Sequence, residues 1–337
     1  MDVPELVTRG DRAEADRWRE ARRTARFGLG SAQMGPVALA LVTDGRFADV
    51  GERLSAAGAD LVGLLAPEPL ESLAWAAAAG ARRAYPDLRS LLADEVEAVC
   101  VDLDLPAAGA VSRSCAHAGV HLVLTRPPTD DPELLRDLVD AAQNFDVDVT
   151  AVLAIRAWPT LPVAQQMLPP LGALRQVTVV GWPIGRQARM ELVDLVRQLC
   201  GDVLAVCAAP AAMPASDLRP GEPVTLALLT SSGATVLVAE RPGTDLEHAT
   251  VTVIGTDGRL VLGSDYLRRQ DARGVAASSV PEGAARSALA VALSGLETSD
   301  SWDRRNGVAA TVGDLLAASR VLEVASGSFD AGGWLEI

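Results

Sequence analysis

Five apolar segments that alternate with helical patterns between residues 37 and 155 constrain the fold of this chain most strongly. They read "VALALVT", "ADLVGLLA", "EAVCVDL", "VHLVLT" and "DVDVTAVLAI". Nearly continuous apolar strands indicate a sheet covered on both faces, and alternation with helices favours parallel strand order. The pattern therefore predicts an α/β domain over residues 35–155 with a Rossmann-like, doubly wound parallel sheet.

The pattern changes after Pro159. Two hairpins are indicated, "PVTLALLTSSGATVLVAE" around Ser-Ser-Gly and "EHATVTVIGTDGRLVLGS" around Thr-Asp-Gly, with helical patterns at 189–200, 281–297 and 308–326. We expect an α+β domain over residues 156–337, built on a mostly antiparallel open sheet. Residues 1–34 form a charged extension in which a helix is expected from about 11 to 27.

Composition narrows the class of partner. A net charge of -14 argues against a nucleic acid or an anionic membrane surface. The charged N-terminus does not resemble a secretory signal, and no apolar run has membrane-spanning length. The four cysteines form no CxxC pair, which favours buried, reduced thiols. With only three histidines we expect no metal site. Because neither a secretory signal nor a membrane-spanning run is recognised, we expect a cytoplasmic protein.

All thirty basic residues are arginine, and the chain contains no lysine. Because there is no lysine, lysine Schiff-base chemistry and a lysine general acid are both excluded, and the arginine guanidinium stays protonated in proteins. An arginine in a site of this chain is therefore expected to bind a negatively charged group and not to transfer a proton.

Three short stretches resemble the Gfo/Idh/MocA (glucose-fructose oxidoreductase, inositol dehydrogenase, rhizopine catabolism) family of NAD(P)-dependent oxidoreductases. They are "AGVHLVLTRP" at 118–127, "RAWP" at 156–159 and "IGTDGRLVL" at 254–262. The resemblance covers roughly residues 37–330 and implies a Rossmann domain followed by an open-sheet domain that carries ligand and oligomer contacts. It also implies NAD or NADP as a possible cofactor and a homo-oligomer.

The loop after the first strand departs from the family's dinucleotide pattern. Thr43 stands at the first glycine position, Gly45 keeps the second, and Ala48 fills the third. Asp44 adds a carboxylate beside the expected position of two phosphate charges. At the end of the second strand, Ala66 replaces the residue that would contact the ribose. These changes predict a degenerate cofactor site.

The ends of the later strands add further polar groups. Asp102 and Asp104 alternate with apolar residues, so both acids face one side of the strand end, where they either bind a cation or are simply solvated. Arg156 either holds an anionic group or is structural at the domain junction. The candidate cofactor contacts are Thr43, Gly45, Ala48, Asp104, Thr125 and Arg156.

The resemblance also implies a catalytic set of a lysine, an aspartate and a histidine. Their positions match Arg126, Gln187 and Glu191, and a further acid of the same helix matches Asp194. Arg126, Glu191 and Asp194 are the candidate catalytic residues. Arg126 and Glu191 either form a repurposed pair across the interdomain cleft, with Glu191 as a base, or are a structural ion pair or solvated side chains.

Three functions follow from these alternatives, and whether the chain is an enzyme stays open. The first is a family member that binds a small molecule in a regulatory or accessory role, without conventional dehydrogenase activity. The second is a working NAD(P)-dependent oxidoreductase on a sugar, polyol or imine-like molecule, with atypical cofactor contacts. The third is a non-redox biosynthetic enzyme that uses the cleft in which the family binds cofactor and substrate.

Overall fold

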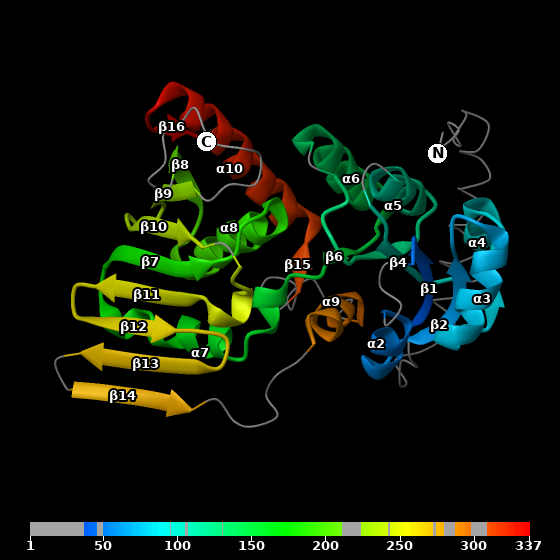
Figure 1. The fold of residues 1–337 in the computed structure, drawn as a ribbon, viewed down its shortest axis with the longest axis horizontal. Coiled ribbons are helices and arrows are strands. Elements are labelled where there is room, and N and C mark those ends of the chain that lie inside the picture. Colours follow the sequence, from blue (N-terminus) through cyan, green and yellow to red (C-terminus); the bar gives the residue numbers. More distant parts are fainter. Residues whose placement is uncertain are drawn as a thin grey trace. The chain divides into compact units, whose positions relative to one another are not determined.

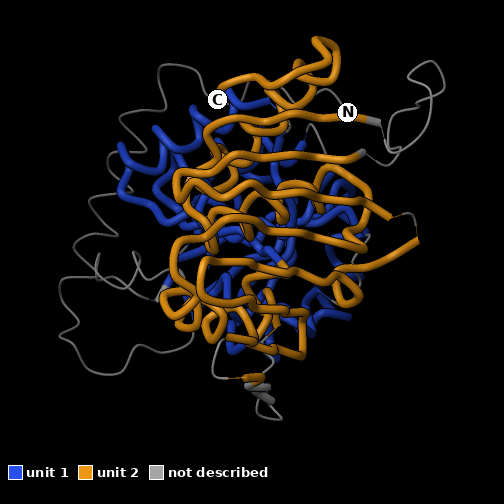
Figure 2. Tube along the Cα trace, turned by 90° about the vertical axis from the view of Figure 1, so that its left-hand side faces the viewer, with its two compact units in different colours: residues 1–153, 289–313 blue, residues 154–288, 314–337 orange. Residues whose placement is uncertain are grey.

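The chain folds into two compact units, which Figure 2 distinguishes by colour. Unit 1 comprises Met1–Leu153 and Leu289–Gly313, and unit 2 comprises Ala154–Ala288 and Asp314–Ile337. This computed structural model describes residues 37–45, 50–94, 96–104, 107–129, 131–210, 224–241, 243–271, 274–279, 287–297 and 309–337. The predicted charged extension and its helix lie outside the described residues.

Unit 1 is built on a seven-stranded sheet in the order β15-β6-β5-β4-β1-β2-β3 (Figure 1). Its strands are β1 (Ala38–Thr43), β2 (Asp60–Leu65), β3 (Arg83–Ala84), β4 (Ala98–Asp102), β5 (His121–Leu124), β6 (Val149–Ala151) and β15 (Ala310–Thr311). All neighbours pair in parallel except β15, which is antiparallel to β6. The predicted doubly wound parallel sheet is confirmed, and its strand order reverses between β1 and β4.

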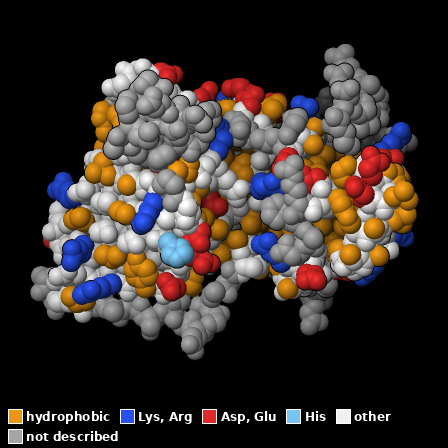
Figure 3. All heavy atoms as spheres, in the orientation of Figure 1, with side chains coloured by type: hydrophobic (Ala, Val, Ile, Leu, Met, Phe, Trp, Pro, Cys, Tyr) orange, Lys and Arg blue, Asp and Glu red, His pale blue; other side chains and the backbone are white. Residues whose placement is uncertain are grey.

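The helices of unit 1 cover this sheet. They are α2 (Val50–Ala56), α3 (Pro69–Ala79), α4 (Leu88–Ala93), α5 (Ala107–His117), α6 (Pro132–Phe145) and α9 (Ala288–Glu297). Helices α2, α3 and α9 share one apolar cluster with β1, β2 and β4. The outer side of α3 is apolar as well, with Leu70 81% and Leu73 62% exposed, and hydrophobic side chains gather over it in Figure 3.

Residues 289–313 belong to unit 1, whereas the sequence pattern assigned everything after 156 to the second domain. Leu289, Ala292 and Leu293 of α9 pack into the core of unit 1, and β15 extends its sheet. A helical pattern indicates an apolar face but does not reveal which sheet that face will cover. The chain therefore passes between the units three times.

Unit 2 contains a nine-stranded sheet in the order β14-β13-β12-β11-β7-β10-β9-β8-β16. The strands are β7 (Leu174–Trp182), β8 (Val203–Pro210), β9 (Val224–Thr230), β10 (Thr235–Glu240), β11 (Thr250–Gly255), β12 (Gly258–Leu262), β13 (Tyr266–Asp271), β14 (Gly274–Ser279) and β16 (Leu335–Glu336). Only β7 and β10 pair in parallel, so the predicted mostly antiparallel sheet and both predicted hairpins are confirmed.

The remaining elements of unit 2 are α7 (Thr160–Met167), α8 (Arg186–Cys200), α10 (Val312–Ala331) and the 3-10 turns η1 (Ala154–Ala157), η2 (Pro169–Leu171) and η4 (Leu246–His248). Helix α8 begins three residues before the predicted 189, and α10 runs from 312 to 331 instead of 308 to 326. In β7, Val177 and Val179 are buried while Val180 is exposed, because one face of this sheet lies against helices and the other is open.

The cysteines are free thiols, three of them buried and Cys207 partly exposed. Cys100 lies on β4 and Cys115 on α5. Among the helices of the described residues, none combines the length and the apolar character needed to cross a membrane.

Candidate functional site

The carboxyl ends of β1, β4 and β5 bring together a group of polar side chains, which we call the strand-end cluster: Thr43, Asp102, Asp104, Thr125 and Arg126. The cluster lies where the strand order reverses, the usual ligand position in open α/β sheets. At its centre is the carboxylate of Asp102, which has no solvent exposure. The hydroxyls of Thr43 and Thr125 donate to its two oxygens over 3.1 and 2.7 Å.

Arg126 is held by two carboxylates of this cluster. Its Nη1 donates to Asp104 Oδ1 over 2.6 Å, and its Nη2 lies 3.4 Å from Asp102 Oδ1. The side chains of Arg126 and Asp104 are 23% and 35% exposed. The charge of Arg126 is thus already opposed by two acids of the same unit.

The loop after β1 is also satisfied internally. The backbone N–H of Gly45 donates to the hydroxyl oxygen of Thr43 over 3.0 Å, and the N–H of Asp44 donates to the carbonyl of Asp102 over 3.3 Å. Thr43, at the first glycine position, therefore links the loop to the buried acid. Ala48, the third candidate of this loop, lies outside the described residues.

Ala66 is 5% exposed and packs in the apolar core of unit 1. Its backbone N–H donates to the hydroxyl of Ser72 over 2.8 Å, which ties the end of β2 to α3. A methyl group buried here has no polar atom for a ribose hydroxyl. The structure therefore places Ala66 in a packing position.

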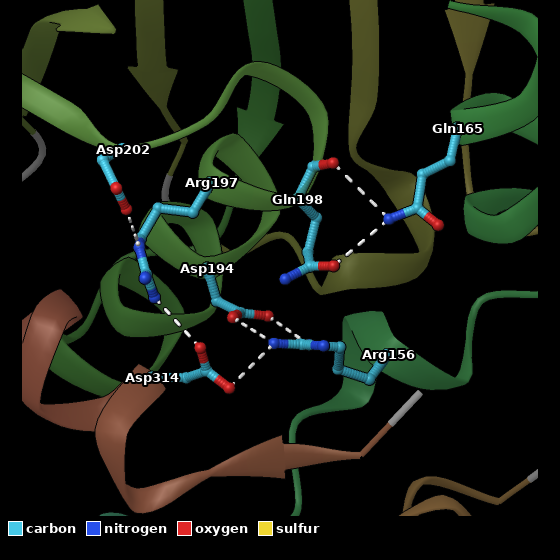
Figure 4. Close-up of polar contacts among 7 residues, drawn as sticks. All are labelled: Arg156, Gln165, Asp194, Arg197, Gln198, Asp202 and Asp314. Atoms are coloured by element: carbon cyan, nitrogen blue, oxygen red, sulfur yellow. Dashed lines mark hydrogen bonds and ion pairs between the residues drawn. The ribbon is translucent and has the colours of Figure 1, made fainter. Parts of the chain in front are cut away.

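A second polar group lies in unit 2, between η1, α8 and the start of α10. We call it the helix cluster: Arg156, Asp194, Arg197 and Asp314 (Figure 4). Arg156 donates to both oxygens of Asp194 over 2.7 Å each, and the two side chains are only 4% and 1% exposed. Arg156 and Arg197 reach Asp314 over 3.2 and 3.1 Å.

Burial alone would lower the pKa of Arg156, but its hydrogen bonds to Asp194 and the charges of Asp194 and Asp314 raise the pKa above its ordinary value. Arg156 therefore stays charged, and its bidentate hydrogen bonds are made to Asp194. Asp314 lies 158 residues further along the chain than Arg156. Neither Asp314 nor Arg197 was indicated by the sequence, because no local pattern reports a pairing at that separation.

Glu191 is 3% exposed and accepts the backbone N–H of Ile155 over 3.1 Å. Burial raises the pKa of Glu191 from 4.5 to about 7, although hydrogen bonds from the backbone of Ile155 and Ala154 and from Gln187 act in the opposite direction. Its carboxylate thus holds the first turn of unit 2 and also titrates near neutral pH.

The predicted site residues divide between the two units. Thr43, Gly45, Asp104, Thr125 and Arg126 lie in unit 1, whereas Arg156, Glu191 and Asp194 lie in unit 2. The contacts given above for each of these side chains stay within its own unit. The pairing of Arg126 with Glu191 across the units stays a prediction.

Several ring side chains outside the two clusters contact neighbouring groups. The rings of His117 and Phe145 lie 4.9 Å apart, and His121 Nδ1 accepts the N–H of Asp148 over 2.8 Å. The buried Trp158 and Trp182 pack against each other at 6.3 Å. Within the described ranges, no group of three or more His, Cys, Asp or Glu side chains is arranged to hold a metal ion.

A parallel Rossmann sheet followed by an open, mostly antiparallel sheet defines the two-domain class that the sequence resemblance implied. Residues 28–152 match the sequence model of the Gfo/Idh/MocA family, an oxidoreductase family with an NAD-binding Rossmann fold. The resemblance to this family is thereby confirmed over the matched residues. None of the curated proteins compared with the chain matches it.

Solved structures are similar over most of the chain. An oxidoreductase from Pseudomonas syringae has 15% identity and a TM-score of 0.77, with 90% of this chain and 100% of that chain covered. An inositol dehydrogenase homolog from Azotobacter vinelandii, solved with NADH and myo-inositol, has 17% identity and a TM-score of 0.75, with 90% and 98% covered. An oxidoreductase from Agrobacterium radiobacter, solved with NAD+, L-tartaric acid and magnesium, has 18% identity and a TM-score of 0.70, with 88% and 97% covered. At these identities the similarity shows a shared fold.

Proposed function

We propose that the protein binds a small molecule in a regulatory or accessory role and has no conventional dehydrogenase activity. The observation that carries this proposal is the loop after β1. There the hydroxyl of Thr43 accepts a hydrogen bond from the N–H of Gly45 and donates one to the buried carboxylate of Asp102. A dinucleotide needs backbone N–H groups directed at its phosphates. The carboxylate of Asp44 would also repel the phosphates of a dinucleotide. Two like charges 4 Å apart repel by about 1 kcal/mol even in water, and more strongly near protein.

The proton-handling positions support the same proposal. Arg126 stands where the family resemblance implies a lysine, and a guanidinium does not release a proton at neutral pH. Asp194 is bound to Arg156 by two hydrogen bonds in a buried site. We assign Arg156 and Asp194 a structural role, and we assign ligand contact to Arg126 and Asp104, whose side chains are partly exposed.

Titration with NADH and NADPH, followed by nicotinamide fluorescence, tests the proposal. We expect no saturable binding at micromolar concentration. A matched variant carrying Thr43→Gly and Asp44→Ala removes the hydroxyl and the charge, and we expect it to bind more tightly than the natural chain. Saturable micromolar binding by the natural chain would overturn the proposal.

A working NAD(P)-dependent oxidoreductase with atypical cofactor contacts is the second candidate. It is favoured by Glu191, whose pKa of about 7 suits a general acid or base. An activity of this kind, tested on sugars and polyols, should change with pH near 7. That pH dependence should disappear in Glu191→Gln.

We also propose a cytoplasmic homo-oligomer that forms through the open face of the unit 2 sheet, which Figure 2 shows as strands side by side. The face carries exposed apolar side chains on five strands: Val180, Leu229, Leu237, Ile254 and Val275. An exposed apolar sheet face of this extent is typical of a subunit interface. Sedimentation velocity should detect an oligomer that Leu237→Arg dissociates, whereas Leu73→Arg in unit 1 should leave it intact.

A further inference from the structure

The glycine at the second position of the dinucleotide loop is in contact with a tryptophan. Gly45 has φ +82, and a Cβ atom placed on it would have three atoms of the Trp75 indole within 3.0 Å. Real side chains do not make such contacts, so only glycine fits beneath this ring. The ring of Trp75 therefore lies directly against the backbone of Gly45.

In dinucleotide-binding loops, the second glycine lacks a side chain so that the pyrophosphate can approach the backbone. This chain keeps a glycine at that position, Gly45, but the indole of Trp75 occupies the space next to its Cα atom. Its N–H is also engaged, by the hydroxyl of Thr43. The retained glycine is therefore explained by the tryptophan, without any bound phosphate.

Helix α3, which carries Trp75, is fixed by contacts on the N-terminal and the C-terminal side of this residue. Before it, the hydroxyl of Ser72 accepts the N–H of Ala66 at the end of β2. After it, Ala79 packs so closely on α2 that a Cβ atom on Gly51 would lie 2.5 Å from the Ala79 Cβ atom. Figure 1 shows α3 beside β2 in the same unit.

The space left beside the ring is small. A cavity of about 70 Å³ remains, and its lining includes Leu41, Thr43, Gly45 and Trp75. Pockets for small molecules and cofactors usually exceed about 300 Å³. The cavity beside the indole is therefore smaller than a usual small-molecule pocket.

We propose that Trp75 closes the dinucleotide site of this chain by occupying the position of the pyrophosphate. This inference rests on the proposed function and deepens it, because it names the side chain that excludes the cofactor. The indole blocks the approach by its volume, whereas Asp44 opposes the phosphates by its charge.

The test compares Thr43→Gly/Asp44→Ala with the triple variant that also carries Trp75→Ala. NADH binding is measured by nicotinamide fluorescence, and folding of each variant is checked by circular dichroism. We expect the triple variant to bind NADH at least tenfold more tightly. Trp334→Ala in the same background removes an exposed tryptophan of unit 2 and should leave the affinity unchanged.

Equal affinity of the double and triple variants, or no binding by either, would overturn the assignment to Trp75 while the proposed function stands. Micromolar binding by the natural chain would overturn both. The contact has a separate test that needs no ligand: Gly45→Ala should lower the unfolding midpoint more in the natural chain than in a Trp75→Ala or Trp75→Leu background. Equal lowering in all three would show that the ring does not lie on Gly45.

Discussion

The strand-end cluster of unit 1 and the helix cluster of unit 2 are both built from arginine and aspartate, yet they differ in their contact with water. In the strand-end cluster, Arg126 and Asp104 are 23% and 35% exposed. In the helix cluster, Arg156 and Asp194 are 4% and 1% exposed. Water competes for the first ion pair and is excluded from the second. The first arginine can therefore exchange its partner, whereas the second is fixed in its ion pair.

The positions of the two clusters explain this difference. The strand-end cluster lies at the edge where an α/β sheet binds ligands. The helix cluster holds the beginnings of two chain segments that enter unit 2, since Arg156 and Asp314 follow directly after two of the crossings. A ligand can replace a partly exposed partner, whereas a buried pair that fixes the chain cannot open without loss of structure.

The largest effect is expected from Asp194→Asn, which removes the partner of a buried guanidinium. Asparagine removes the negative charge that opposes Arg156 at 2.7 Å, and breaking a buried ion pair from one side costs about 3 to 5 kcal/mol. Urea unfolding followed by tryptophan fluorescence measures the loss. The control is Asp202→Asn, because Asp202 pairs with Arg197 but is 74% exposed and should contribute less than about 1 kcal/mol. Equal losses in the two variants would contradict the comparison.

Glu191→Gln should remove a pH dependence from the stability of unit 2. The folded pKa of Glu191 is raised from 4.5 to about 7, so folding favours the protonated form. Its contribution is complete below pH 4.5 and is lost as pH rises through about 7, a change on the order of 3 kcal/mol. Glutamine does not ionise and can still accept the N–H of Ile155, so the variant should not lose stability over this range.

Urea unfolding at about pH 5 and about pH 8 measures this effect, because the two conditions lie on either side of the expected titration. Glu323→Gln, at an exposed position of α10, serves as the control and should follow the natural chain. If Glu191→Gln kept the full pH dependence of the natural chain, the titration would have to be assigned to another group.

Asp102→Asn probes the centre of the strand-end cluster. The variant replaces the carboxylate that accepts from Thr43 and Thr125, and hydrogen bonds to a charged group contribute about 1.5 to 3 kcal/mol. We expect a loss of about 2 kcal/mol in urea unfolding, since asparagine keeps one acceptor oxygen. A paired measurement on Thr125→Val should show part of the same loss. No change in either variant would mean that the buried acid does not organise the strand ends.

Strand segments and the parallel or mostly antiparallel character of each sheet could be predicted from the sequence, because apolar periodicity and turn residues are local signals. Both predicted hairpins of unit 2 were found. The sequence also placed Asp102 and Asp104 on one side of the strand end, and both now contact Arg126. The hydroxyl of Thr43 as a link to Asp102 could not be predicted, because it depends on the register of two strands 59 residues apart.

The smallest effect is expected from Arg126→Gln, and this variant sharpens the comparison most directly. The ion pair with Asp104 is partly exposed, so its loss should change the unfolding free energy by less than about 1 kcal/mol. Glutamine keeps donor groups for Asp104 but lacks the charge. Urea unfolding of Arg126→Gln beside Asp194→Asn then sets an exchangeable arginine against a broken buried pair in one protein. A loss of the size expected for Asp194→Asn would mean that Arg126 holds the fold of unit 1 and is not available to a ligand.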